Sequence, residues 1–181
     1  HALETAGIWG IELDFRWTKD LHPVVAHDPD LQRLFGSNLR IAETTLAELK
    51  QHCPLVPTLE EVLLRYGGKL HLMVEAKEEH YPQPEKQNMI LKELFAPLKP
   101  REDFHLLSLD PEMLVLVKFV DTSAKIPVAD FNAKTLSKIS LNEKYAGLGG
   151  HYLLLHKKIV KQHLDCGQKI GVGYPKSKNN L

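Results

Sequence analysis

The stretch GIWGIELDF, residues 7–15, decides how the rest of the chain is interpreted. Its apolar character is typical of a buried strand. Side chains alternate along a strand, so Glu12 and Asp14 share one face while Ile11 and Leu13 share the other. Two adjacent carboxylates repel each other and are costly to bury unless a cation lies between them. Oxygen ligands at this spacing suit Mg²⁺ or Ca²⁺, although a solvated strand face is the simpler alternative.

Beyond this stretch, short apolar strands alternate with helical segments. This rhythm predicts an α/β fold with parallel strands. An extended piece at 23–26 follows a turn near Asp20 and predicts a hairpin extension of the first strand. Further strands are expected at 69–75, 104–109, 126–129, 147–148 and 169–172. With 7–15 they make six barrel-type strands, whereas a closed (β/α) barrel has eight.

The helical segments carry clear start signals. Thr45 with Glu48, and Thr58 with Glu61, form two capping boxes, in which hydroxyl and carboxylate satisfy opposite free amides. A third helix is expected over 87–98. Others are expected to begin near Pro111, Ala133 and Lys157.

Composition narrows the function classes. The 181 residues are 43% hydrophobic and 25% charged, which is typical of one globular domain spanning 1–181. Acidic and basic residues number 23 each, so no global field attracts nucleic acid or an anionic membrane. No apolar run approaches the ~18 residues of a membrane span. We expect a cytoplasmic protein, but the chain begins at His1 without a methionine, so a signal peptide stays open.

A third carboxylate ends the strand at 69–75. Glu75 and Lys77 share a face by alternation, and a structural ion pair is the simplest interpretation of the two alone. Beside the first strand, Glu75 becomes a third metal ligand. Lys77 then becomes a charge that holds a phosphate oxygen. Arg16 shares the face of Asp14 and is a candidate for the same role.

His27 follows the apolar residues of 23–26 and enters a polar loop. Its ordinary pKa lies near neutrality, which suits proton transfer to the leaving group of a phosphodiester. The chain has 10 histidines, so a loop histidine without a function is the alternative.

The order of these motifs resembles the glycerophosphodiester phosphodiesterase family. The resemblance is specific over residues 7–77 and continues more weakly to about 175. It is carried by Glu12-x-Asp14, Thr18-Lys19-Asp20, Pro23-Val24-Val25-Ala26-His27-Asp28 with Leu31 and Arg33, Thr45-Leu46-Ala47-Glu48-Leu49, Val56-Pro57-Thr58-Leu59-Glu60-Glu61-Val62-Leu63 and Val74-Glu75-Ala76-Lys77.

The resemblance implies an eight-stranded TIM-type barrel and one divalent cation, Mg²⁺ or Ca²⁺. Its ligands would be Glu12, Asp14 and Glu75, and His27 would be one of two catalytic histidines. The implied reaction is hydrolysis of a small glycerophosphodiester to glycerol phosphate and an alcohol. The implied partner is therefore this small substrate, and the resemblance leaves the oligomeric state open.

The chain also departs from the family pattern. It lacks the His-Arg-Gly motif that ends the family's first strand and carries the other catalytic histidine. We therefore expect a fragment whose barrel lacks its first and last strands. Leu21 stands where the family usually has a turn glycine, so we expect the hairpin turn to differ.

Two other functions remain open. A phospholipase-D-like enzyme of the same barrel would act on lysophospholipid or sphingomyelin and would need an exposed apolar rim, and no apolar run stands out in the sequence. A non-catalytic phosphodiester-binding domain would keep the three carboxylates and lack the first histidine.

Overall fold

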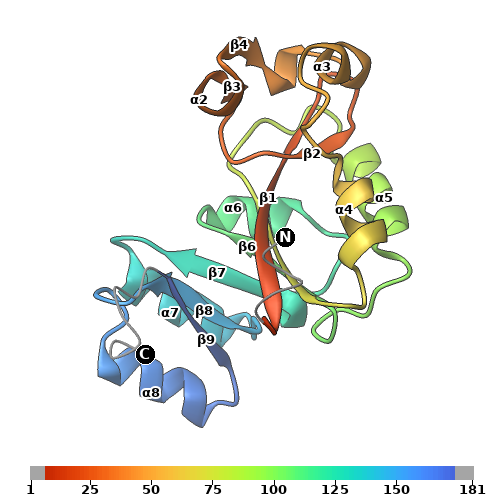
Figure 1. Ribbon diagram of the computed structural model, residues 1–181. Coiled ribbons are helices and arrows are strands. Elements are labelled where there is room, and N and C mark those ends of the chain that lie inside the picture. The colour runs from red at the N-terminus through yellow and green to blue at the C-terminus, as the bar shows by residue number, and fades with distance from the viewer. Residues whose placement is uncertain (1–6, 174–181) are drawn as a thin grey trace.

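The structure, a computed structural model, describes residues 7–173. Its main sheet holds six parallel strands, each paired with the next in chain order (Figure 1). A short strand, β2, pairs antiparallel with β1 on the side away from β5. The strands are β1 (Gly10–Trp17), β2 (Pro23–Val25), β5 (His71–Ala76), β6 (Phe104–Ser108), β7 (Lys125–Ala129), β8 (Gly147–His151) and β9 (Lys169–Gly173). The six parallel strands and the hairpin predicted from the sequence are confirmed.

Helices connect consecutive parallel strands. They are α3 (Leu46–His52), α4 (Leu59–Tyr66), α5 (Pro84–Phe95), α6 (Pro111–Leu116), α7 (Ala133–Asn142) and α8 (Lys157–Asp165), with 3-10 turns at Ile41–Glu43 and Thr122–Ala124. Both predicted capping boxes form at the starts of α3 and α4. Among the described helices, none combines the length and apolar character needed to cross a membrane.

The barrel is not closed within residues 7–173. Among the strands, β9 pairs only with β8 and β2 only with β1, so the sheet keeps two separate edges. A closed (β/α) barrel has eight parallel strands, and six are present here. The α/β class and the incomplete barrel predicted from the sequence are therefore confirmed.

The two faces of β1 have different surroundings. Leu13 and Phe15 are 7% and 1% exposed and belong to the main core, together with Leu59 of α4 and Leu91 of α5. Glu12 alternates with these residues and is exposed on the other face. Burial of Leu13 and Phe15 fixes the register of β1, because a shift by one residue would place the carboxylates in the core.

An excursion between β2 and α4 has its own small core. It contains β3 (Asp30–Leu31), α2 (Gln32–Phe35), β4 (Ser37–Arg40) and α3. Figure 1 shows this segment beyond the carboxyl end of β1, away from α7 and α8. The buried hydrophobic side chains of this core are Val24 of β2 with Leu31, Ile41, Leu49, Cys53 and Val56. The sequence did not predict β3, α2 or β4, since elements of two to four residues are too short to show a period.

The turn between β1 and β2 keeps a glycine-like backbone without a glycine. Leu21 has a φ of 63°, in the left-handed region that glycine favours. Its N–H donates to the carbonyl oxygen of Thr18, and its side chain is 4% exposed in the main core. Burial of the leucine offsets the backbone strain. The expected difference from the family's turn stays a prediction.

Candidate metal and phosphodiester site

Three carboxylates meet toward the carboxyl ends of β1 and β5. Asp14 and Glu75 are register partners on these two strands, and Glu12 lies two residues before Asp14. One oxygen from each carboxylate lies within 4.8 Å of the others. The side chains of Asp14 and Glu75 are 15% and 11% exposed. The structure therefore brings together all three residues predicted as metal ligands.

The carboxylates destabilise one another as anions. Partial desolvation by the atoms around it, and after that the charges of Asp14 and Glu75, raises the pKa of Glu12 to about 7, although the side chain still reaches solvent. A divalent cation would relieve this repulsion, and carboxylate oxygens are the ligands that Mg²⁺ and Ca²⁺ prefer. The donor set thus fits one hard divalent cation.

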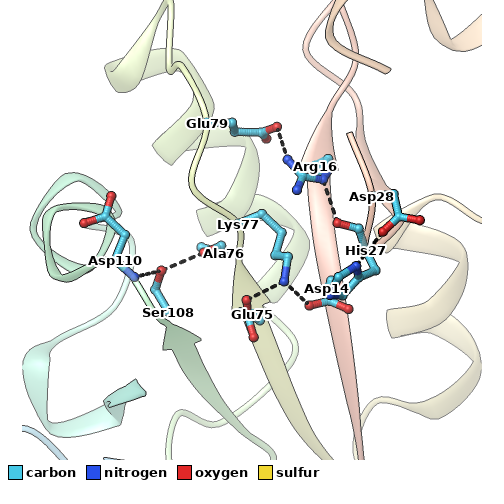
Figure 2. Close-up of polar contacts among 10 residues, drawn as sticks. All are labelled: Asp14, Arg16, His27, Asp28, Glu75, Ala76, Lys77, Glu79, Ser108 and Asp110. Atoms are coloured by element: carbon cyan, nitrogen blue, oxygen red, sulfur yellow. Dashed lines mark hydrogen bonds and ion pairs between the residues drawn. The ribbon is translucent and has the colours of Figure 1, made fainter. Parts of the chain in front are cut away.

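Lys77 lies beside two of these carboxylates. Its Nζ is 3.1 Å from Asp14 Oδ1 and 2.8 Å from Glu75 Oε1 (Figure 2). Burial opposes the charge of the ammonium, but the hydrogen bonds and charges of Glu75 and Asp14 outweigh burial and raise the pKa of Lys77. The ammonium therefore stays charged at neutral pH, next to the place where a metal-bound anion would lie.

His27 is held by its neighbour. Its Nδ1 lies 2.7 Å from Asp28 Oδ1, and Arg33 Nε donates to Asp28 Oδ2 at 2.6 Å. The hydrogen bond from Arg33, and then that from His27, lowers the pKa of Asp28 to about 2. Because an ionised carboxylate only accepts, His27 Nδ1 carries the proton of this contact. Nε2 is then the nitrogen available for proton transfer, on a side chain that is 60% exposed.

Arg16 has protein partners for its guanidinium. Its Nη1 lies 3.3 Å from Glu79 Oε2, and its Nε donates to the carbonyl oxygen of His27 at 3.0 Å (Figure 2). Glu79 Oε1 also accepts from the backbone N–H of Trp17 at 2.8 Å. Arg16 thus fastens the His27 loop and the segment after β5 to the end of β1. Its contact with a phosphate oxygen stays a prediction.

Sequence reasoning missed three supporting residues. Asp28 orients His27, and its position next to His27 in the chain could have signalled this role. Burial, which outweighs the contacts with the Trp17 amide and Arg16, raises the pKa of Glu79 to about 7. Ser108 donates to the carbonyl oxygen of Ala76 at 2.8 Å and joins the ends of β5 and β6. Glu79 and Ser108 connect segments that are distant in sequence, so no local pattern marks them.

Comparison with known proteins identifies the family. The sequence model of the glycerophosphoryl diester phosphodiesterase family matches residues 1–161. Since this match covers most of the 181 residues, the chain belongs to that family. The resemblance drawn from the motifs of the first 77 residues is therefore confirmed.

Individual relatives agree with this result. The YhdW protein of Bacillus subtilis (strain 168), named provisionally as a glycerophosphodiester phosphodiesterase, is 37% identical over 78 residues. The match covers 37% of this chain and 32% of YhdW, so it spans about a third of that relative's length.

Solved structures share the fold over nearly the whole chain. A glycerophosphodiester phosphodiesterase from Thermotoga maritima has a TM-score of 0.78 and 25% identity, with 99% of this chain and 78% of that chain covered. An Oleispira antarctica phosphodiesterase, solved with its product sn-glycerol-3-phosphate, has a TM-score of 0.77 and 23% identity. That alignment covers 96% of this chain and 76% of the Oleispira chain.

Proposed function

We propose that this chain carries the metal-binding half of a phosphodiesterase that hydrolyses glycerophosphodiesters to glycerol phosphate and an alcohol. The observation that carries the proposal is the convergence of Glu12, Asp14 and Glu75 within 4.8 Å. The charged Lys77 lies beside two of them.

The three carboxylates would hold one divalent cation, Mg²⁺ or Ca²⁺. When bound, the cation would supply positive charge to a phosphoryl oxygen of the substrate. Lys77 would hold a second oxygen of the phosphate through its ammonium. Arg16 would add positive charge near the phosphate. It would also keep the His27 loop in place, because its Nε donates to the carbonyl oxygen of His27.

His27 would move the proton. Its Nε2 is available because Asp28 fixes Nδ1 in the protonated form. As a general acid it would protonate the oxygen of the leaving alcohol, and as a general base it would activate the attacking oxygen. The attacking oxygen is either that of water or that of a neighbouring glycerol hydroxyl.

The test is release of glycerol phosphate from glycerophosphocholine by the full-length protein. We expect turnover with Mg²⁺ or Ca²⁺, loss of turnover in a chelator, and recovery when the cation is restored. Full activity in the chelator would disprove the metal assignment. Tight binding of the cation and the diester without any turnover would favour the non-catalytic binding domain.

A second candidate is hydrolysis of lysophospholipids. Leu109, Phe131 and Leu153 are 47%, 92% and 64% exposed, and each lies within two residues of the carboxyl end of β6, β7 or β8. These loops lie at the end of the sheet where barrel enzymes bind their substrates. The sequence has no continuous apolar run there, but separate exposed side chains supply some of the apolar rim that a lipid substrate needs.

The two candidates differ in substrate preference. We expect a higher kcat/KM for glycerophosphocholine than for lysophosphatidylcholine, because most of the site is polar. Comparable values would favour the second candidate. In that case Phe131→Ser should lower only the value for lysophosphatidylcholine, since the side chain would contact the acyl chain and not the phosphate.

A further inference from the structure

Two neighbouring loops at the carboxyl end of the sheet carry exposed apolar side chains. Phe131 lies between β7 and α7 and is 92% exposed, and Leu153 lies between β8 and α8 and is 64% exposed. The strands β7 and β8 are parallel neighbours, so both loops leave the same end of the sheet (Figure 1). Two large apolar side chains therefore protrude from the end of the sheet toward which the three carboxylates of β1 and β5 also lie.

The fold fixes the exposure of these two side chains. Ala133 and Leu155, each two residues further along the chain, are 6% and 7% exposed and pack in one core cluster. The N–H of Leu153 also donates to His151 Nδ1 at 3.2 Å. Since the core below each loop is already filled by these neighbours, Phe131 and Leu153 stay in contact with water unless a partner covers them. Covering them is favourable because it removes apolar surface from water.

Three lysines flank the two loops. Lys134 lies in the first turn of α7, and Lys157 and Lys158 lie in the first turn of α8. All three are exposed, and none has an ion-pair partner among the described residues. The two loops and these first turns contain one acidic residue, Asp130, against the three lysines. The surface around the apolar side chains is therefore positively charged.

The charges at the starts of α7 and α8 are opposite to those at the helices before them. The helices α3, α4, α5 and α6 each have a glutamate in the first turn, whereas α7 and α8 have no acidic residue there. The amino end of a helix carries partial positive charge, so a lysine in the first turn is unfavourable for the helix. Neither α7 nor α8 has a side-chain hydrogen bond at its N-cap to offset this cost. The three lysines do not stabilise these helices, and an anion outside the chain explains their position better.

We propose that this protein docks on an anionic lipid membrane through a docking surface formed by Phe131, Leu153, Lys134, Lys157 and Lys158. The lysine ammonium groups contact the lipid phosphates, and the two apolar side chains enter the boundary between head groups and acyl chains. This combination matches a membrane, in which an anionic layer covers an apolar one. An acidic protein would attract the lysines but would also need apolar recesses for side chains on two separate loops.

Docking in this way turns the carboxyl end of the sheet, with the candidate metal site, toward the lipid. The proposal does not depend on the proposed hydrolytic function, because it concerns binding to a membrane and not the cleavage of any lipid. It also differs from the hydrolysis of lysophospholipids, in which Phe131 would contact the acyl chain of a single bound substrate.

Co-sedimentation of the full-length protein with lipid vesicles tests the proposal. One set of vesicles is phosphatidylcholine alone, and the other is phosphatidylcholine and phosphatidylglycerol in equal parts. A chelator is present, so that no divalent cation can bridge the carboxylates to the lipid. We expect binding to the anionic vesicles to be about tenfold tighter than to the neutral ones and to weaken as salt screens the lysines. Equal binding to both sets, or binding to neither, would overturn the proposal.

Matched variants separate binding from folding. Lys157→Glu with Lys158→Glu should lower the affinity for anionic vesicles by at least about tenfold, while the Tm does not decrease, because glutamate suits the first turn of a helix. Phe131→Ser should also lower this affinity about tenfold. Lys92→Glu and Leu64→Ser, at exposed sites on α5 and α4, are the controls and should bind like the wild type.

The result that would contradict the docking surface is unchanged vesicle binding by the lysine variant or by Phe131→Ser. Sedimentation without vesicles tests the other occupant, a second copy of the chain. A dimer that Phe131→Ser dissociates, in a protein that does not bind the anionic vesicles, would assign the surface to that second copy and overturn the proposal.

Discussion

At the carboxyl ends of β1 and β5, three carboxylates lie together and two of them contact the ammonium of Lys77, whereas Arg101, Lys144 and Lys169 line a cavity at the amino ends of β6, β8 and β9 beside the buried His105. The first group favours a metal cation, whereas none of the described residues that line the second carries a carboxylate. Both lie on a chain whose 23 acidic and 23 basic residues cancel. A net charge of zero therefore excludes a global field but says nothing about strong local fields of either sign.

The largest effect is expected from removing one carboxylate. Glu75→Ala should abolish divalent-cation binding and turnover, because Glu75 is the only ligand that β5 contributes to the trio. Calorimetry with Mg²⁺ and Ca²⁺ measures cation binding, and the glycerophosphocholine assay measures turnover. Glu60→Ala, at an exposed site on α4, is the control and should change neither. Cation binding that survives Glu75→Ala would remove the contrast between the two ends.

Loss of the proton carrier should be the next largest effect. His27→Ala should lower kcat by roughly 10²–10⁴-fold and leave cation affinity nearly unchanged, because His27 lies outside the carboxylate trio. Asp28→Asn should lower kcat less, through loss of the fixed Nδ1 proton. His22→Ala, an exposed histidine of the same hairpin, is the control. If His27→Ala releases the cation, His27 is a ligand and the assignment is wrong.

The strained residues at the two ends should respond oppositely to glycine. Leu21→Gly relieves the backbone but removes a side chain that is 4% exposed in the core. We expect it to lower the free energy of unfolding by about 2 kcal/mol, since lost burial exceeds the relieved strain. Urea unfolding measures the change. Lys144 has a φ of 55° and is exposed, so Lys144→Gly loses no core contact and should not destabilise the protein. Equal effects of both variants would show that burial does not pay for the conformation of Leu21.

The two ends should also differ in pH dependence when no divalent cation is present. Glu12 has a pKa raised from 4.5 to about 7, so the folded state binds more protons in this window and stability falls as pH rises through it. His105 has a pKa lowered from 6.5 to about 4, so the unfolded state binds more protons and stability falls as pH decreases through that window.

Urea unfolding in a chelator between about pH 4 and pH 7 separates the contributions of Glu12 and His105 to stability. Glu12→Gln should remove the fall in stability toward neutral pH, and His105→Asn should remove the fall toward acid pH. The two variants should therefore change the slope of stability against pH in opposite directions. Slopes that change in the same direction would contradict the electrostatic difference between the ends.

The elements that the sequence predicts well are those with local signals. Alternation placed Glu12 and Asp14 on one face of β1, and the capping boxes at Thr45 and Thr58 located the starts of two helices. The three metal-binding carboxylates could be predicted together because Glu75 ends the strand that is next to the first one in the barrel order. These features need only a period, a cap or a motif, so a single sequence is enough to find them.

The features that were missed depend on partners distant in the chain. Arg16 was interpreted as a free cation because Glu79, its partner, lies 63 residues away. The pair of His71 and His105 joins two strands across 34 residues, and neither histidine lies in a recognisable motif. Tertiary packing alone determines which polar groups pair and which are left without partners.

The double contact of Glu79 makes one backbone amide a reporter for the carboxyl-end site. The N–H of Trp17 donates to Glu79, whose other oxygen meets Arg16, and Arg16 in turn holds the carbonyl oxygen of His27. Hydrogen exchange at Trp17 therefore requires the hydrogen bond between its N–H and the Glu79 carboxylate to open. Slow exchange at this amide would mean that Glu79, Arg16 and the His27 loop are positioned before any substrate arrives, so that binding need not order them.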